Sequence, residues 1–250
     1  MADVPPGGDD PLRMYLVVRR GGLTDLARGG ELAGAAAVAC VRLAADDERF
    51  AADLEAWRPR PGKVTLRARG GQWTQLLDAH AHVLAGEPDG AAVAALPPQR
   101  RSRRDALLDR LQAMTSALEP PPGTVARDPA RVTYVVNPRL EMSSGKTLAQ
   151  IAHAAVMAAG TGALEPWVAA GCPARVVRPA QRGAFDALCA SDGLAARVVD
   201  AGLTEVAPGT VTVLALPPAA TVSAVVVPGA AEERGQRGDG EDERHPAHDL

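Results

Sequence analysis

The sequence predicts an α/β protein built from two similar compact halves, each a small sheet flanked by helices. Short apolar runs alternate with Ala-rich helical stretches along the whole chain. Aromatic residues make up only 3% of the composition, so the core must be built from Ala, Val and Leu. Such a core favours closely packed helices against Val-rich strands. The 250 residues suit one large or two small domains.

The first half is expected to span residues 12–99, after a disordered lead over residues 1–11 that is acidic and rich in turn residues. Gly-rich sequence over residues 21–30 suggests a loop before the first helix. The expected elements are strands over residues 15–18, 63–67 and 91–96, and helices over residues 32–43, 48–57 and 73–80.

A helical linker is expected over residues 100–130. Leu107, Leu108, Leu111, Met114 and Leu118 recur at the spacing of an amphipathic helix. The segment Glu119-Pro-Pro-Pro-Gly then breaks the pattern, which predicts an extended connection to the second half.

The second half is expected over residues 131–220, and the charged, Gly-rich tail over residues 221–250 is expected to be disordered. Its predicted elements are strands over residues 132–136, 175–177, 196–199 and 211–216, and helices over residues 148–159 and 183–190.

The two halves share the order of their expected elements and several residues at matching positions, which suggests an internal duplication. The matches are Tyr15 with Tyr134, Trp57 with Trp167, Lys63 with Arg175, Trp73 with Phe185, and Ala95-Leu-Pro-Pro with Ala215-Leu-Pro-Pro. The alternative is that Ala- and Val-rich sequences align with one another by composition alone.

Composition limits the classes of function. A formal net charge of -3 excludes a globally basic nucleic-acid binder but permits a local basic patch. The three cysteines form no CxxC pair and are odd in number, which favours a reducing compartment over a disulfide framework. The N-terminus has no basic-then-apolar order and no run suits a membrane span, so a cytoplasmic protein is expected.

Lys146 is the first candidate functional residue. Only two of the 27 basic residues are lysines, Lys63 and Lys146, and Lys146 lies between an expected strand and helix. Lys146, Gln150 and His153 share one face of that helix. With Ser144 as the expected N-cap, free N–H groups near Lys146 would suit a phosphate or an oxyanion. For His153 alone, a partly buried, hydrogen-bonded structural role is the simpler interpretation.

Strand, loop, Gly-Lys-Thr and helix also outline a phosphate-binding P-loop. That motif requires a glycine five residues before Gly145, and Leu140 occupies the position. The loop has no other glycine to wrap a phosphate chain, so nucleotide binding is the less favoured interpretation.

The run from Asp200 to Leu214 is the second candidate region. Asp200 ends an expected strand, at the edge where ligands bind in open α/β sheets. A carboxylate, threonine hydroxyls at Thr204 and Thr212 and an ammonium could together position and deprotonate a water. Ordinary turn chemistry explains Asp and Thr in such a run equally well.

Together these residues resemble the type II peptidyl-tRNA hydrolase family over residues 131–220. The matching segments are Val132-Thr-Tyr-Val-Val, Met142-Ser-Ser-Gly-Lys, Ala149-Gln-Ile-Ala-His-Ala-Ala-Val, Trp167 and Asp200-Ala-Gly-Leu-Thr-Glu-Val-Ala-Pro-Gly-Thr-Val-Thr-Val-Leu. The resemblance implies a four-stranded mixed sheet flanked by helices. It also implies hydrolysis of the ester between peptide and tRNA in peptidyl-tRNA, without a metal or cofactor.

The resemblance implies catalytic roles for Lys146, Asp200, Thr204 and Thr212. It further implies that substrate is bound by Gln150, His153, Gly145 and Thr210. Members of the family often dimerise, so we expect either a monomer with an internal pseudo-dimer or a homodimer.

The chain departs from the family pattern at two places. Asn137, Pro138 and Arg139 follow the first strand where the family has an Arg and, two residues later, an Asp. Ser143 and Ser144 replace a glycine and a lysine of the loop. These departures leave open a non-catalytic protein of the same fold that binds tRNA or a protein.

The first half is expected to be a degenerate copy. Gly30 or Glu31 is expected at the position of the lysine and Ala37 near that of the histidine, while the Asp-Ala-Gly-x-Thr segment is missing. A single active site in the second half is therefore predicted.

Overall fold

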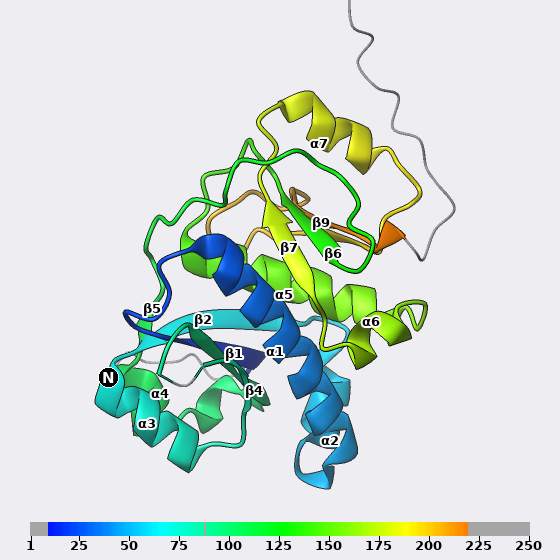
Figure 1. Ribbon diagram of the computed structural model, residues 1–250. Coiled ribbons are helices and arrows are strands. Elements are labelled where there is room, and N and C mark those ends of the chain that lie inside the picture. The colour runs from blue at the N-terminus through cyan, green and yellow to red at the C-terminus, as the bar shows by residue number, and fades with distance from the viewer. Residues whose placement is uncertain (1–9, 88, 220–250) are drawn as a thin grey trace, which may run out of the picture.

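The computed structural model describes residues 10–87 and 89–219 (Figure 1). Most of the segments expected to be disordered, 1–11 and 221–250, lie outside these residues. The described residues form two sheets, a five-stranded sheet with the order β3-β4-β1-β2-β5 and a four-stranded sheet with the order β7-β6-β9-β8. Helices flank both sheets, which confirms the predicted α/β class with two small sheets.

The first half contains one strand that the sequence did not reveal, β3, and a longer β4 than expected. Its elements are β1 (Leu12–Arg19), α1 (Leu26–Asp46), α2 (Glu48–Trp57), β2 (Gly62–Ala68), α3 (Gly70–Ala79), β3 (Val83–Gly86) and β4 (Ala92–Arg100). β4 continues through Pro97 and Pro98 because the β1–β4 register shifts opposite them, between Arg13 and Tyr15. A bulge of this kind is where a sheet tolerates proline.

Helix α1 begins six residues earlier than predicted. Asp25 caps it by accepting a hydrogen bond from the Ala27 N–H at 2.9 Å. Gly29 and Gly30 are therefore helical, despite the low helix propensity of glycine. The reason is contact with the second half, since a Cβ on Gly30 would lie 2.7 Å from Val176 Cγ2 and 2.8 Å from Ile151 Cδ1 of α5 (Ser144–Gly160). The glycines allow the two helices to approach closely.

The prediction of a long linker helix is wrong. The segment forms a short 3-10 turn, Arg101–Arg103, followed by α4 (Ala106–Arg110) and β5 (Gln112–Ala113), and is otherwise extended or irregular. The expected apolar residues are nonetheless mostly buried, because Leu107, Leu108 and Leu111 pack on the outer face of the first sheet. A strand paired with β2 then replaces the expected helical turn.

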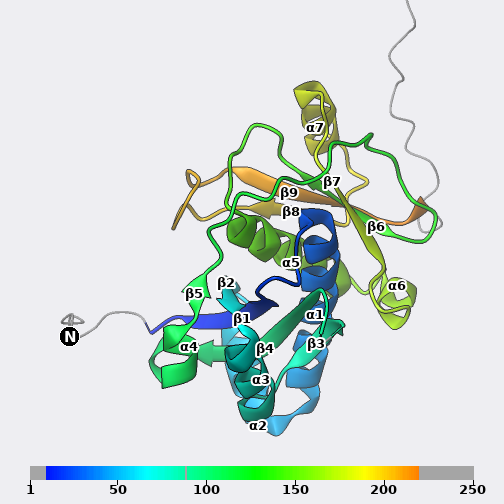
Figure 2. The same cartoon turned by 60° about the vertical axis from the view of Figure 1, so that its left-hand side comes forward.

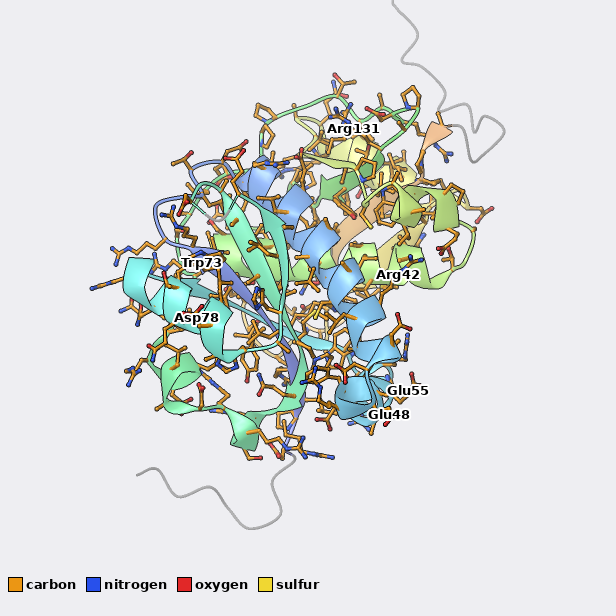
Figure 3. The ribbon with its side chains drawn as sticks, turned by 60° about the horizontal axis from the view of Figure 1, so that its bottom comes forward. Arg42, Glu48, Glu55, Trp73, Asp78 and Arg131 are labelled. Atoms are coloured by element: carbon orange, nitrogen blue, oxygen red, sulfur yellow. The ribbon has the colours of Figure 1, made fainter. Side chains whose placement is uncertain are left out.

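In the second half, β6, β8 and β9 lie where the sequence predicts strands. Its elements are β6 (Val132–Val136), α5, α6 (Glu165–Ala169), β7 (Ala174–Val177), α7 (Arg182–Cys189), β8 (Ala196–Val199) and β9 (Val211–Leu216). Only the short helix α6 was not expected. An ion pair joins Glu165 of α6 to Arg42 of α1. Figure 3 labels Arg42.

Helices α1 and α5 lie side by side between the two sheets, as Figures 1 and 2 show. One apolar cluster joins Val38 of α1 to the second sheet, and another joins Leu148 and Ala152 of α5 to the first sheet. Helices α3 and α7 cover the outer faces through Trp73 and Phe185. Within the described residues, no helix has the length and apolar character needed to span a membrane.

The two halves share one topology. In each, the first strand pairs parallel to the second and antiparallel to the last, and the last also pairs with the third. The indoles of Trp57 and Trp167 both donate 2.8 Å hydrogen bonds to backbone carbonyls, of Gly62 and Pro173 respectively. The four strands of the second half and the first four of the first half are thus equivalent in order and direction.

The residue-by-residue correspondence of the two halves in the structure differs from the one that the sequence matches suggest. Leu16 lies opposite Ala95 and Tyr134 opposite Ala215, so Leu16 rather than Tyr15 corresponds to Tyr134. Tyr15 faces the outer cluster, whereas Tyr134 faces α1 and α5. Leu16 also pairs with Thr65 and Tyr134 with Val176, so Lys63 corresponds to Ala174 rather than to Arg175. The matches of Tyr15 with Tyr134 and of Lys63 with Arg175 were therefore each wrong by one residue, and a shift of one residue exchanges the faces of a sheet.

Candidate active site

An ion pair between Lys146 and Asp200 forms the centre of the candidate site. The Lys146 ammonium donates to Asp200 Oδ2 at 2.5 Å and to Thr204 Oγ1 at 2.9 Å. Lys146 lies on the first turn of α5, and Asp200 directly follows β8. Their side chains are only 12% and 6% exposed. Charges paired away from water interact more strongly than they would at a surface.

Gln150 extends this pair to β9. Its amide Nε2 donates to Asp200 Oδ2 at 2.6 Å, and its Oε1 accepts a 3.0 Å hydrogen bond from the Thr212 hydroxyl. Thr212 is completely buried. The structure thus brings five of the predicted residues into one hydrogen-bonded network, Lys146, Gln150, Asp200, Thr204 and Thr212.

The loop after β8 holds the Asp200 carboxylate in place. Gly202 N–H donates to Asp200 Oδ1 at 2.8 Å, and the Asp200 N–H donates to the Thr210 carbonyl at 2.9 Å. Burial alone would raise the pKa of Asp200. The hydrogen bonds from Lys146, Gly202 and Gln150, with the ammonium charge, instead lower this pKa below its usual value. Asp200 is therefore ionised at neutral pH. Thr210 contributes to this site by accepting the Asp200 N–H with its backbone carbonyl.

The N–H groups at the N-terminus of α5 already have hydrogen-bond acceptors, contrary to expectation. Ser143, not Ser144, is the N-cap, and its hydroxyl accepts from the Lys146 N–H at 3.2 Å. The Ser144 N–H donates to the Ser116 carbonyl at 2.8 Å, and the Gly145 N–H to the Met114 carbonyl at 3.0 Å. The predicted free N–H groups are thus taken by the linker, and the P-loop interpretation loses its phosphate donors.

Gly145 is consequently buried beneath the linker rather than open to a ligand. A Cβ at this position would lie 2.3 Å from the Met114 carbonyl oxygen, so Gly145→Ala must displace the linker backbone. We expect the free energy of unfolding to fall by roughly 1–3 kcal/mol, as for other overpacked sites. Urea denaturation measures this loss.

Gly160→Ala is the matched control, because nothing lies within 4 Å of a Cβ at that end of α5. Its stability is expected to stay within about 1 kcal/mol of the parent or rise slightly. Equal stability of the two variants would contradict the close packing of the linker on Gly145.

Glu205 was not singled out from the sequence, yet it anchors the loop that carries Thr204. Its carboxylate accepts from the Ser143 N–H and from the Ser143 hydroxyl, both at 2.7 Å. The contact ties the start of α5 to the loop after β8. Its only signal in the sequence is its place directly after Thr204.

The departures from the family pattern have structural roles here. The Asn137 amide donates to the Val211 carbonyl at 2.8 Å and holds the end of β6 on β9, beside Thr212. Arg139 pairs with Asp186 of α7. The Ser144 hydroxyl accepts from the Leu118 N–H at 2.8 Å and so fastens the linker.

His153 lies one turn beyond Gln150 and remains uncharged at neutral pH. Burial lowers the pKa of His153 to about 3, and the positive charges of Lys63 and Lys146 lower it further than the Asp200 charge raises it. A neutral imidazole can donate one hydrogen bond and accept another. His153 is therefore available to bind a polar group without adding charge.

Among residues 12–87 and 89–99 of the first half, the structure shows no equivalent network. Counting from the N-caps Asp25 and Ser143, the counterpart of Lys146 is Arg28 and that of His153 is Ala35. The sequence-based assignment of these positions to Gly30 or Glu31 and to Ala37 was therefore wrong. Arg28 is exposed and pairs with Glu31 at 3.2 Å. In the strand corresponding to β9, Ala92 occupies the position of Thr212.

The comparison with known protein families gives a match to the second half of the chain. Residues 130–227 match the family model described as Peptidyl-tRNA hydrolase PTH2. The match covers less than half of the chain but includes every residue of the hydrogen-bonded network. The resemblance of this segment to the type II family is thereby confirmed, and the first half lies outside the match.

Proposed function

We propose, on the premise that residues 130–227 are a type II peptidyl-tRNA hydrolase segment, that this protein hydrolyses the ester between peptide and tRNA. The family match supports hydrolase function at the level of the family. The observation that carries the finer proposal is the buried Lys146–Asp200 pair, with the exposed Thr204 hydroxyl on its open side. Recycling of tRNA from stalled peptides would follow from this reaction.

In the proposed reaction, water adds to the ester carbonyl and the ribose oxygen leaves with a proton, giving a free peptide carboxylate and tRNA. The Lys146 ammonium stabilises the negative charge that develops on the carbonyl oxygen. Thr204 positions the water. Because the pKa of Asp200 is lowered, this carboxylate is a weak base, and its main role is to orient Lys146 and Gln150.

Specificity is proposed to come from the rim of the site. Gln150 and His153 would contact polar groups of the substrate along α5. Val199 and Leu203, which are 53% and 76% exposed, flank Asp200 and Thr204 in the chain and offer apolar contacts. Peptidyl-tRNA combines polar ribose and phosphate groups with apolar side chains, so both kinds of contact suit it.

Internal duplication with loss of the first site is also part of the proposal. The shared topology and the matched Trp57 and Trp167 hydrogen bonds support common descent of the halves. The packing of α1 against α5 would then replace a dimer interface, giving a monomeric pseudo-dimer in the cytoplasm. A stable homodimer in solution, measured by light scattering, would count against this arrangement.

A non-catalytic protein that binds tRNA or a protein is the second candidate. It is favoured by the occupied N-terminus of α5, where the Ser144 and Gly145 N–H groups already donate to the linker. The complete network of Lys146, Gln150, Asp200 and Thr212 opposes it, since binding alone requires no buried ion pair.

Incubation with N-acetyl-aminoacyl-tRNA separates the two candidates. The expected result is release of free tRNA and N-acetyl-amino acid, with little action on aminoacyl-tRNA that lacks the acetyl group. Filter binding in parallel measures affinity for the same tRNA. Binding without release would favour the non-catalytic candidate, and ATP turnover would restore the P-loop interpretation.

A further inference from the structure

Lys63 of the first half lies against the helix that carries the candidate site. β2 runs beside α5, and the Thr65 hydroxyl donates to the Gly145 carbonyl at 2.9 Å. Because alternate residues of a strand share a face, Lys63 points to the same side as Thr65. Its ammonium lies 4.6 Å from the centre of the Trp57 ring. The sequence had suggested an unremarkable strand position for this lysine.

The Lys63 ammonium is buried, and no described residue is its hydrogen-bond partner. An unpaired buried charge is unfavourable, and one cation–π contact compensates only part of the cost. Burial accordingly lowers the pKa of Lys63 to about 7. A methionine would fill the same space without this cost, so the lysine is not explained by packing.

His153 is the titratable group of α5 that Lys63 affects. Among the charges acting on the His153 imidazole, Lys63 has a larger effect than Asp200 or Lys146, which belong to the network itself. Lys63 and His153 come from different halves, on β2 and α5, and these two elements pack against each other.

The first half provides an independent indication that Lys63 lines the site. A pocket of about 390 Å³ there is lined by Arg28, Leu32 and Ala35, the counterparts of Lys146, Gln150 and His153. Its facing wall includes Ala174, next to Arg131, which Figure 3 labels. Because Trp57 and Trp167 bond the residues just before Lys63 and Ala174, these two positions correspond.

We propose that Lys63 is a positioning residue of the second-half site, supplied by the first half, with its ammonium beside His153 and the Lys146–Asp200 pair. The site is then a composite of both halves. Its consequence for catalysis rests on the proposed function, but the effect on His153 does not.

Proton NMR titration of the His153 ring in the full-length protein tests this proposal, with His153→Gln used to assign the signal. In the parent, the imidazole should stay neutral down to about pH 3. In Lys63→Met, we expect its pKa to rise by about one unit or more. Lys63→Arg retains the charge and should leave the pKa of His153 as low as in the parent. Arg28→Met is the control for loss of an exposed charge.

An unchanged His153 titration in Lys63→Met would overturn the proposal, as would an equal change in Arg28→Met. The second measurement is the pH dependence of kcat/KM for N-acetyl-aminoacyl-tRNA, in which Lys63→Met should move the acidic limb to higher pH. If no variant or parent hydrolyses the substrate, the proposed function fails, while the NMR titration still decides the role of Lys63.

Discussion

Lys146→Met is expected to lower the free energy of unfolding at pH 7 by about 3–5 kcal/mol and hydrolysis by roughly 10²–10³-fold. The substitution leaves Asp200, whose side chain is 6% exposed, without its counter-ion. Two hydrogen bonds, from Gln150 and Gly202, are too few to replace an ammonium. The loss of activity follows from removal of the only side-chain charge placed to stabilise an oxyanion in this network.

The pH dependence of this loss distinguishes an unpaired carboxylate from lost packing. In the parent, the lowered pKa of Asp200 contributes stability above the ordinary carboxyl pKa, and that contribution is lost as the pH falls through the lower folded value. In Lys146→Met the folded pKa rises instead, so protonation favours the folded state. Urea denaturation should thus show a smaller deficit at pH 4.5 than at pH 7, and an equal deficit would contradict the buried pair.

Lys63→Met is expected to stabilise the protein by roughly 3–6 kcal/mol at pH 6. The folded pKa of Lys63 is about 7, below its ordinary value of 10.5, because the ammonium is buried. The unfolded chain therefore binds the proton more tightly than the folded chain. The resulting destabilisation is fully present below about pH 7 and disappears as the pH rises toward the unfolded value.

Thermal or urea unfolding between pH 6 and pH 10 measures this difference. The stability of the parent should rise with pH from about pH 7 upward, and Lys63→Met should lack that component. Arg28→Met, which removes an exposed charge, should follow the parent. A variant less stable than the parent at pH 6 would show that the ammonium has a partner in solution and would contradict its unpaired burial.

The sequence predicts most of the second half because its signals are local. The apolar runs of β6, β8 and β9 are bounded by turn residues, and the spacing of Lys146, Gln150 and His153 follows from helical geometry. The approach of Asp200 to Lys146 required the resemblance to a family, because 53 residues separate them and no periodicity links them.

Features that depend on contacts between the halves could not be predicted in this way. Gly30 is accommodated in α1 because Val176 of β7 and Ile151 of α5 leave no room for a Cβ there. The segment expected to be a linker helix turns instead into β5 and the cover over Gly145, where pairing with β2 outweighs helical spacing. Lys63 is informative only once β2 is placed beside α5, since its neighbours in sequence give no sign of His153.

Side-by-side hydrolysis assays of Lys146→Met and Arg28→Met most directly test the claim of a single active site in the second half. These residues occupy corresponding positions of the two halves, so each variant removes one charge from the first turn of equivalent helices. With N-acetyl-aminoacyl-tRNA, the account predicts tRNA release by the parent and by Arg28→Met at similar rates, and roughly 10²–10³-fold slower release by Lys146→Met. Equal rates for the parent and Lys146→Met, or a loss of activity in Arg28→Met alone, would contradict it.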